Sequence, residues 1–127
     1  YEEVIEVLTE IGGKAVIGIF SEGEIDHQLT KLIKTDIKKH FQDDHIHIFT
    51  KKLYALSEVL LRYQNKKLYF IDDRLDVLRG VKDSDPSIFT IWIKRGEHAE
   101  LLSEIMGFKP DAEVVNLREI IDIVNNE

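Results

Sequence analysis

Cysteine is absent from the 127 residues, and proline occurs only twice. Without cysteine, disulfide frameworks and thiolate metal sites are excluded, and a reducing cytoplasm is the expected location. The sequence also lacks an apolar run long enough to cross a membrane, and no signal peptide is recognisable at Tyr1. Repeats, low-complexity segments and interdomain linkers are missing as well, so residues 1–127 are predicted to form one domain with a real core.

Positive charge is scarce, with 17 basic residues against 24 acidic ones and a formal net charge of −7. Binding to nucleic acid regardless of sequence needs clustered Lys and Arg, so we expect neither a nucleic-acid partner nor a membrane partner. The chain opens without Met, directly on a helical pattern. This start indicates a segment of a larger protein, although processing or a cloning boundary would give the same beginning.

Short apolar runs alternate with amphipathic stripes along the chain. Strands are expected near residues 15–20, 45–50, 68–71, 88–93 and 113–115. Helices are expected near residues 4–11, 25–41, 53–63, 75–81, 97–106 and 117–124. This alternation predicts an α/β fold with a mainly parallel sheet, helices on both faces and right-handed crossovers.

Two adjacent aspartates, Asp72 and Asp73, follow the apolar run Leu68–Ile71, which is typical of a strand buried on both faces. Both cannot be buried cheaply, because neighbouring like charges repel. We expect them at the carboxyl end of the strand, where open α/β sheets bind ligands and where carboxylates suit Mg²⁺. The alternative is that the pair caps the following helix. Asp76 is either an acid that orients the metal site or a first-turn helix acid, and Arg74 pairs with Asp76 or Asp72.

Two further strand ends carry polar groups that suit phosphate. Ser21 follows the first predicted strand, and Lys51 or Lys52 follows the second. The carboxyl ends of parallel strands share one edge, so a hydroxyl, an ammonium and the Asp72–Asp73 pair are expected to converge there. The hydroxyl would donate to a phosphate oxygen, and the ammonium would neutralise its charge.

These residues, in this order, resemble the haloacid dehalogenase-like (HAD) superfamily of phosphatases and hydrolases over nearly the whole chain. The resemblance is carried by the segments Ile17–Gly23, Thr50–Lys52, Phe70–Arg74 with Val81 and Lys82 behind it, and Ala112–Glu119. A receiver domain of signalling systems combines the same groups, but its acids come first and its lysine last. The order hydroxyl, lysine, acids favours the HAD resemblance.

The resemblance implies a Rossmannoid three-layer α/β/α fold and a Mg²⁺-dependent phosphatase acting on a small phosphorylated substrate. Ser21, Glu22 and Gly23 would bind the phosphate. Lys51 or Lys52 would be the catalytic lysine, with a slight preference for Lys51. Asp73 would be the main Mg²⁺ ligand, and Asp72 would assist directly or through water.

The family's first motif, an Asp-x-Asp at a strand end that supplies the nucleophile and the general acid, is missing. Asp83-Ser84-Asp85 has these letters, but it follows a helix and precedes Pro86, so it is interpreted as a turn. The nucleophile would then lie outside this chain, and the strands starting at Ala15 and Leu68 would be open edges. An upstream segment or a second copy of the chain would complete the sheet.

Two other functions stay open beside the phosphatase. The missing motif also fits a HAD-like domain that binds a phosphorylated ligand or a protein partner without catalysis. A flavodoxin-like or receiver-type module is a weaker third interpretation. Among the remaining residues, His45 and His47 alternate on a predicted strand, where a solvated face is favoured over a metal site. Trp92 is predicted to belong to the core.

Overall fold

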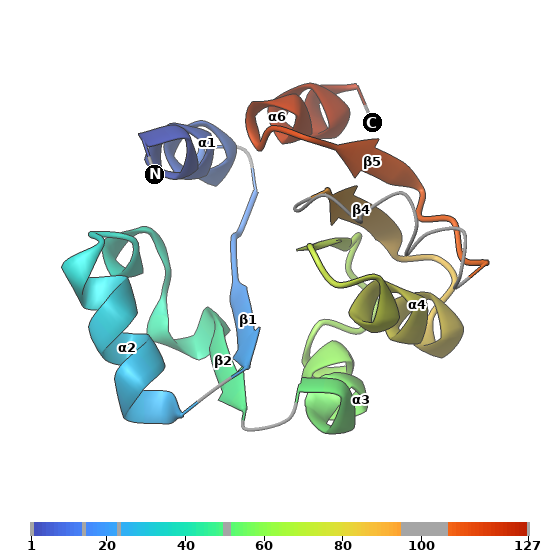
Figure 1. The fold of residues 1–127 in the computed structure, drawn as a ribbon, viewed down its shortest axis with the longest axis horizontal. Helices are drawn as coiled ribbons and strands as arrows, with labels where there is room; N and C mark the ends of the chain where they lie inside the picture. The colour runs from blue at the N-terminus through green and yellow to red at the C-terminus, as the bar shows by residue number, and fades with distance from the viewer. Residues whose placement is uncertain (1, 14, 23, 50–51, 95–106, 127) are drawn as a thin grey trace. The chain divides into compact units, whose positions relative to one another are not determined.

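The computed structural model describes residues 2–13, 15–22, 24–49, 52–94 and 107–126 (Figure 1). The helices are α1 (Glu2–Gly12), α2 (Ile25–Lys34), α3 (Lys52–Arg62), α4 (Leu75–Ser84) and α6 (Arg118–Asn125), with short 3₁₀ turns η1 (Lys38–His40) and η2 (Asp43–His45). The strands are β1 (Ile19–Glu22), β2 (Ile46–Phe49), β3 (Tyr69–Asp72), β4 (Phe89–Ile93) and β5 (Ala112–Val114). The predicted alternation of helices and strands is confirmed, and the helix predicted at residues 97–106 lies outside the described residues. No helix in the described ranges is both long and apolar enough to pass through a bilayer.

The strands form two parallel ladders rather than one continuous sheet. β1 pairs with β2 in unit 1 (Tyr1–Ala55 and Ile120–Glu127), and β3, β4 and β5 pair in that order in unit 2 (Leu56–Glu119). Every one of these pairings is parallel, as the alternation predicts. Among the described strands, β1 pairs with β2 alone and β3 with β4 alone. Completion of the sheet by a further strand stays a prediction.

Strand β1 lies further along the chain than the apolar run Ala15–Phe20 predicts. Its ladder with β2 runs from the pair Ile19–Ile46 to the pair Glu22–Phe49. Residues 15–18 precede the strand, and Val16 is 76% exposed. Hydropathy marks an apolar run, but strand bounds are set by backbone pairing, so the predicted bounds were wrong and Ser21 lies inside the strand.

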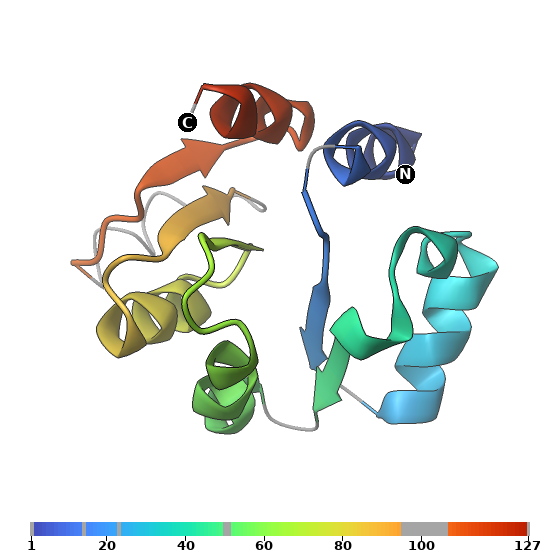
Figure 2. The same ribbon diagram turned by 180° about the vertical axis from the view of Figure 1, so that it is seen from behind.

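Unit 2 holds the best-buried side chains. Helix α4 presents Leu75, Leu78 and Val81 at helical spacing, and Leu78 and Val81 are fully buried. The helix lies against β3 and β4, as Figures 1 and 2 show from opposite sides. Asp85 closes it as the C-cap, and its carboxylate accepts hydrogen bonds from the backbone N–H and the hydroxyl of Ser87. Asp83 and Ser84 therefore form the end of α4, so the prediction that they follow the helix was wrong, and only Asp85 lies in the turn.

In unit 1, helix α2 lies beside the β1–β2 ladder (Figure 1) and is shorter than its apolar stripe predicts. It ends at Lys34 instead of continuing to Phe41, because the chain turns through Asp36 with a φ of 61°. The N–H of Ile37 donates to the carbonyl of Leu32, and that of Asp36 donates to Ile33. This pattern is a Schellman motif, which terminates helices. Periodicity alone does not register such a backbone reversal.

Strand β3 is less buried than its apolar sequence predicts. Ile71 is 39% exposed, whereas Phe70 packs against Leu75, Leu78 and Trp92 on the other face of the strand. The prediction of burial on both faces was wrong, because only the face that carries Phe70 packs against this cluster. The buried residue of this strand is instead a polar one, Asp72, which is only 8% exposed.

Candidate functional site

The two aspartates differ in environment although they are neighbours in sequence. Asp72 is the last residue of β3 and is buried, while Asp73 begins the turn toward α4 and is exposed. An oxygen of Asp72 (Oδ1) accepts the backbone N–H of Arg74 at 2.8 Å. The Asp73 carboxylate makes no hydrogen bond or ion pair with another described residue. The turn thus holds one anchored carboxylate and one that faces solvent.

Neither Asp72 nor Asp73 is the N-cap residue of α4. The N-cap residue is Arg74, and its side chain makes no capping hydrogen bond. In the first turn, Asp76 Oδ1 accepts the N–H of Val77 at 3.0 Å, and the guanidinium of Arg74 donates to both oxygens of Asp76 at 3.2 and 2.8 Å. This hydrogen bonding by Arg74 lowers the pKa of Asp76. Asp76 is therefore a first-turn helix acid paired with Arg74.

Trp92, in the neighbouring strand β4, contacts the turn formed by Asp72, Asp73 and Arg74, here named the acidic turn. It stands opposite Asp72 in the β3–β4 register and is 1% exposed, so its predicted place in the core is confirmed. Its indole N–H (Nε1) donates to the backbone carbonyl of Asp73 at 3.1 Å. This contact was not predicted from the sequence. The available signal was general: a buried tryptophan needs an acceptor for its N–H.

The predicted phosphate-binding and lysine residues belong to unit 1. Ser21 and Glu22 are the last residues of β1 and pair with Ile48 and Phe49 of β2. Lys52 is the first residue of α3, three residues beyond the end of β2, while Gly23 and Lys51 lie outside the described residues. The parallel ladder therefore places the carboxyl ends of β1 and β2 side by side. Their convergence with Asp72 and Asp73, which belong to unit 2, stays a prediction.

A magnesium ion would have two carboxylates to use at the acidic turn. Within the described ranges, no three His, Asp or Glu side chains gather as a metal-binding group. Mg²⁺ is commonly held by one or two carboxylates, with water and substrate phosphate completing its octahedron. The anchored Asp72 and the exposed Asp73 fit that donor set. Asp76 contributes less, because Arg74 already neutralises its charge.

The two histidines do not share a solvated strand face. His45 ends the 3₁₀ turn η2, and only His47 lies in β2. His47 is buried, at 6% exposure, so the favoured interpretation of a solvated face was wrong for this residue. Strand β2 begins one residue later than the alternating pattern indicates, so His45 lies outside it.

Lys82, which the family resemblance groups with Phe70–Arg74, makes its contacts at the opposite end of the strands. Its ammonium (Nζ) donates to the carbonyls of Pro86 and Ile88 and to Oδ2 of Asp111, at 2.9, 2.8 and 2.6 Å. The same oxygen accepts the N–H and the hydroxyl of Thr90, at 2.8 and 3.0 Å. Burial disfavours ionisation of Asp111, but Lys82 and Thr90 outweigh it, so its pKa is lowered. This cluster links the end of α4 to the starts of β4 and β5.

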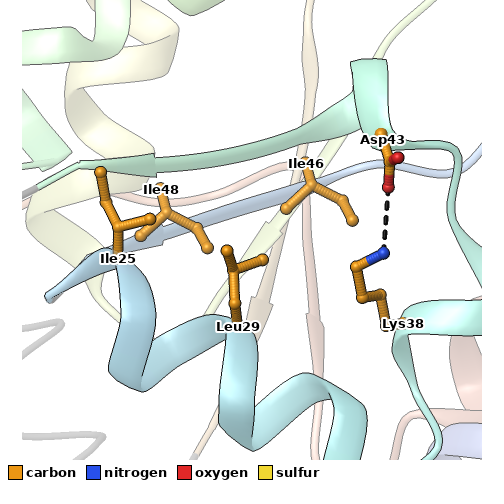
Figure 3. Close-up of a pocket in the computed structure, with 6 residues that line it drawn as sticks. All are labelled: Ile25, Leu29, Lys38, Asp43, Ile46 and Ile48. Atoms are coloured by element: carbon orange, nitrogen blue, oxygen red, sulfur yellow. Dashed lines mark hydrogen bonds and ion pairs between the residues drawn. The ribbon is translucent and has the colours of Figure 1, made fainter.

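A pocket of about 470 Å³ lies in unit 1 between α2 and β2 (Figure 3). Its apolar walls are Ile25, Leu29, Ile46 and Ile48. At one end the ammonium of Lys38 and a carboxylate oxygen of Asp43 form an ion pair of 3.0 Å, as the dashed line in Figure 3 marks. The pocket contains none of the predicted site residues, and its charges neutralise each other, so it offers little to a phosphate.

The chain resembles a known protein in its three-dimensional structure. No protein-family model matches the chain, and no curated protein matches it. A crystal structure of a protein from Burkholderia xenovorans LB400, classed as a haloacid dehalogenase-like hydrolase, superposes with a TM-score of 0.79 at 20% sequence identity. The match covers 95% of this chain and 57% of that one. The chain therefore has an α/β fold of the HAD-like Rossmannoid kind, as predicted, and spans little more than half of the neighbour's length.

Proposed function

We propose that this chain is the phosphate- and metal-binding part of a HAD-like hydrolase, a Mg²⁺-dependent phosphatase for a small phosphorylated substrate. The observation that carries the proposal is the acidic turn. One carboxylate is buried and anchored at the carboxyl end of a parallel strand, and its neighbour is exposed and without a described partner. Helix capping does not explain this arrangement, since Arg74 occupies the N-cap position and Asp76 serves the first turn.

In this proposal Asp73 is the main Mg²⁺ ligand and Asp72 assists directly or through water. The ion would neutralise phosphate charge as it develops in the transition state. Anchoring of Asp72 by the Arg74 N–H fixes one carboxylate in place before any ion arrives, which reduces the ordering that binding requires. Ser21, Glu22 and Gly23 would hold the phosphate, and Lys51 or Lys52 would balance its negative charge.

Catalysis would proceed through an aspartyl-phosphate whose nucleophile is not among these residues. Strand β1 ends in Ser21 and Glu22, with no aspartate at either position. The remaining strand ends likewise lack an Asp-x-Asp, because Asp83-Ser84-Asp85 belongs to the end of α4 and its turn. A segment outside these residues would supply the nucleophile.

Mg²⁺ binding to the 127-residue chain, measured by isothermal titration calorimetry, tests the metal site. Asp73→Asn is expected to weaken binding by at least about tenfold, because the exposed carboxylate loses its charge. Asp83→Asn is the matched control, since Asp83 is also an exposed aspartate of unit 2 but lies at the far end of α4. Equal Mg²⁺ affinity in the wild type and Asp73→Asn would contradict the proposal.

A non-catalytic HAD-like domain that binds phosphate or a protein partner is the second candidate. The absence of an aspartate at the end of β1 favours it. Hydrolysis of an aryl phosphate with Mg²⁺ separates the two functions when it is measured on a longer form of the protein that includes upstream residues. Turnover that Asp73→Asn abolishes supports the phosphatase, whereas phosphate binding without turnover supports the second candidate. Hydrolysis by the 127-residue chain alone would contradict both.

A further inference from the structure

We infer that Trp92 is a positioning residue for the acidic turn, and that its indole N–H sets where the Asp72 and Asp73 carboxylates stand. The inference deepens the proposed function and, as far as metal binding is concerned, rests on it. The contact itself is independent of any metal: the indole nitrogen of Trp92 lies 3.1 Å from the backbone oxygen of Asp73.

The tryptophan is held from several sides. Leu75 and Leu78 of α4 form a buried cluster with it, and Phe70 and Phe108 pack against that cluster. The ammonium of Lys94 lies 5.6 Å from the ring centroid. A ring so enclosed has little freedom to turn, so its N–H points in a fixed direction. The acidic turn is consequently attached to a buried hydrophobic cluster of unit 2.

The turn is attached at two successive residues. The carbonyl of Asp73 accepts from Trp92, and the carboxylate of Asp72 accepts from the N–H of Arg74. Trp92 also stands opposite Asp72 in the parallel register, which fixes the backbone just before the turn. Between these attachments the Asp73 side chain faces solvent. Loss of the indole N–H would therefore free the turn without removing either carboxylate.

Trp92→Phe tests this role, because phenylalanine keeps an aromatic ring but removes the N–H donor. Hydrogen exchange by NMR compares the amide of Arg74, which reports the turn, with that of Lys94, which donates to Val114 and reports the ladder. The Arg74 amide is expected to exchange about fivefold faster relative to the Lys94 amide, the factor for one neutral hydrogen bond.

Leu78→Val is the matched control. Leu78 is fully buried in the same cluster, so its truncation leaves a cavity beside Trp92 without touching the indole N–H. It should leave the ratio of the two exchange rates unchanged. If Leu78→Val changes the ratio as much as Trp92→Phe does, or if Trp92→Phe leaves it unchanged, Trp92 acts through packing alone and the inference is overturned.

The unmutated chain gives a second measurement if Trp92→Phe does not fold. Its sole tryptophan yields a single indole N–H resonance. That proton is expected to be protected from exchange. Its exchange should quicken in Asp72→Ala, which removes the acceptor of the Arg74 N–H, but not in Asp83→Ala. An indole proton that exchanges as rapidly as in a free peptide would contradict the contact.

Mg²⁺ calorimetry separates this inference from the proposed function. If the wild type binds Mg²⁺, Trp92→Phe should weaken binding about fivefold while Leu78→Val does not. Unchanged affinity in Trp92→Phe would overturn the role in metal binding. If the wild type shows no Mg²⁺ binding, the proposed metal site fails, and the exchange ratio still decides whether Trp92 positions the turn.

Discussion

Asp111→Ala should destabilise unit 2 substantially, because one oxygen of this residue serves three donors. Oδ2 accepts from the Lys82 ammonium and from both the N–H and the hydroxyl of Thr90. Thr90 is fully buried, so its N–H would lose its acceptor in a place that water reaches poorly. An unsatisfied buried donor costs about 1–3 kcal/mol, and a hydrogen bond to a charged group contributes a similar amount.

Partial compensation limits the total loss. Lys82 keeps the carbonyls of Pro86 and Ile88 as acceptors, and the Asp111 side chain is 29% exposed, so water can replace part of what is lost. We therefore expect the free energy of unfolding to fall by about 2–3 kcal/mol in Asp111→Ala. Asp111→Asn should cost only about 1 kcal/mol, because its amide oxygen can still accept from Thr90.

Urea unfolding followed by the fluorescence of Trp92, the only tryptophan in the chain, measures this loss within unit 2. With an m-value of about 1–1.5 kcal/mol/M, the midpoint of Asp111→Ala should fall by about 2 M. Asp83→Ala is the control, since that exposed residue should change the free energy by less than about 0.5 kcal/mol. A loss in Asp111→Ala no larger than in the control, or one matched by Asp111→Asn, would refute the reasoning.

Two other predictions concern ionisation and capping. The pKa of Asp111 is lowered in the folded chain, so its ionised carboxylate stabilises the fold at pH values above the unfolded pKa of about 3.9. This stabilisation is lost as the pH falls through the lower folded pKa. The stability advantage of the wild type over Asp111→Asn should therefore shrink as urea titrations move from about pH 6 to about pH 2.5, and a constant difference would contradict this. Glu24→Ala removes the acceptor for the amides of Asp26 and His27, at 3.1 and 2.8 Å, so both should exchange several-fold faster by NMR while Glu24→Gln changes them less. Unchanged exchange in Glu24→Ala would mean that Glu24 does not cap α2.

Local periodicity predicted helix α4 and strand β4 of unit 2 well. Leu75, Leu78 and Val81 mark α4, Asp85 and Pro86 mark its end, and the apolar run from Ile88 marks β4. In these segments the hydropathy pattern and the backbone pairing agree. Periodicity failed where distant pairing decides the bounds, as in β1, which is shifted toward Glu22 by its register with β2.

The site was predicted in part. Like-charge repulsion between Asp72 and Asp73 indicated that both could not be buried, and the structure buries only Asp72. The contact of Trp92 with Asp73 and that of Lys82 with Asp111 depend on the registers of β4 with its neighbours, joining residues 19 and 29 positions apart. No local sequence pattern encodes such contacts. The predicted roles of Ser21, Lys51 and Lys52 depend on tertiary placement and stay predictions.

Buried side chains are distributed unevenly between the two units, and this affects where the chain tolerates amino-acid substitutions. Val77, Leu78, Val81, Thr90 and Ile91 are inaccessible to solvent, and all belong to unit 2. In α2 of unit 1, by contrast, no described side chain is buried. Neutral drift should therefore erase sequence similarity between related chains fastest along α2 and slowest across residues 75–93. A distant relative would be recognised first by this short central block.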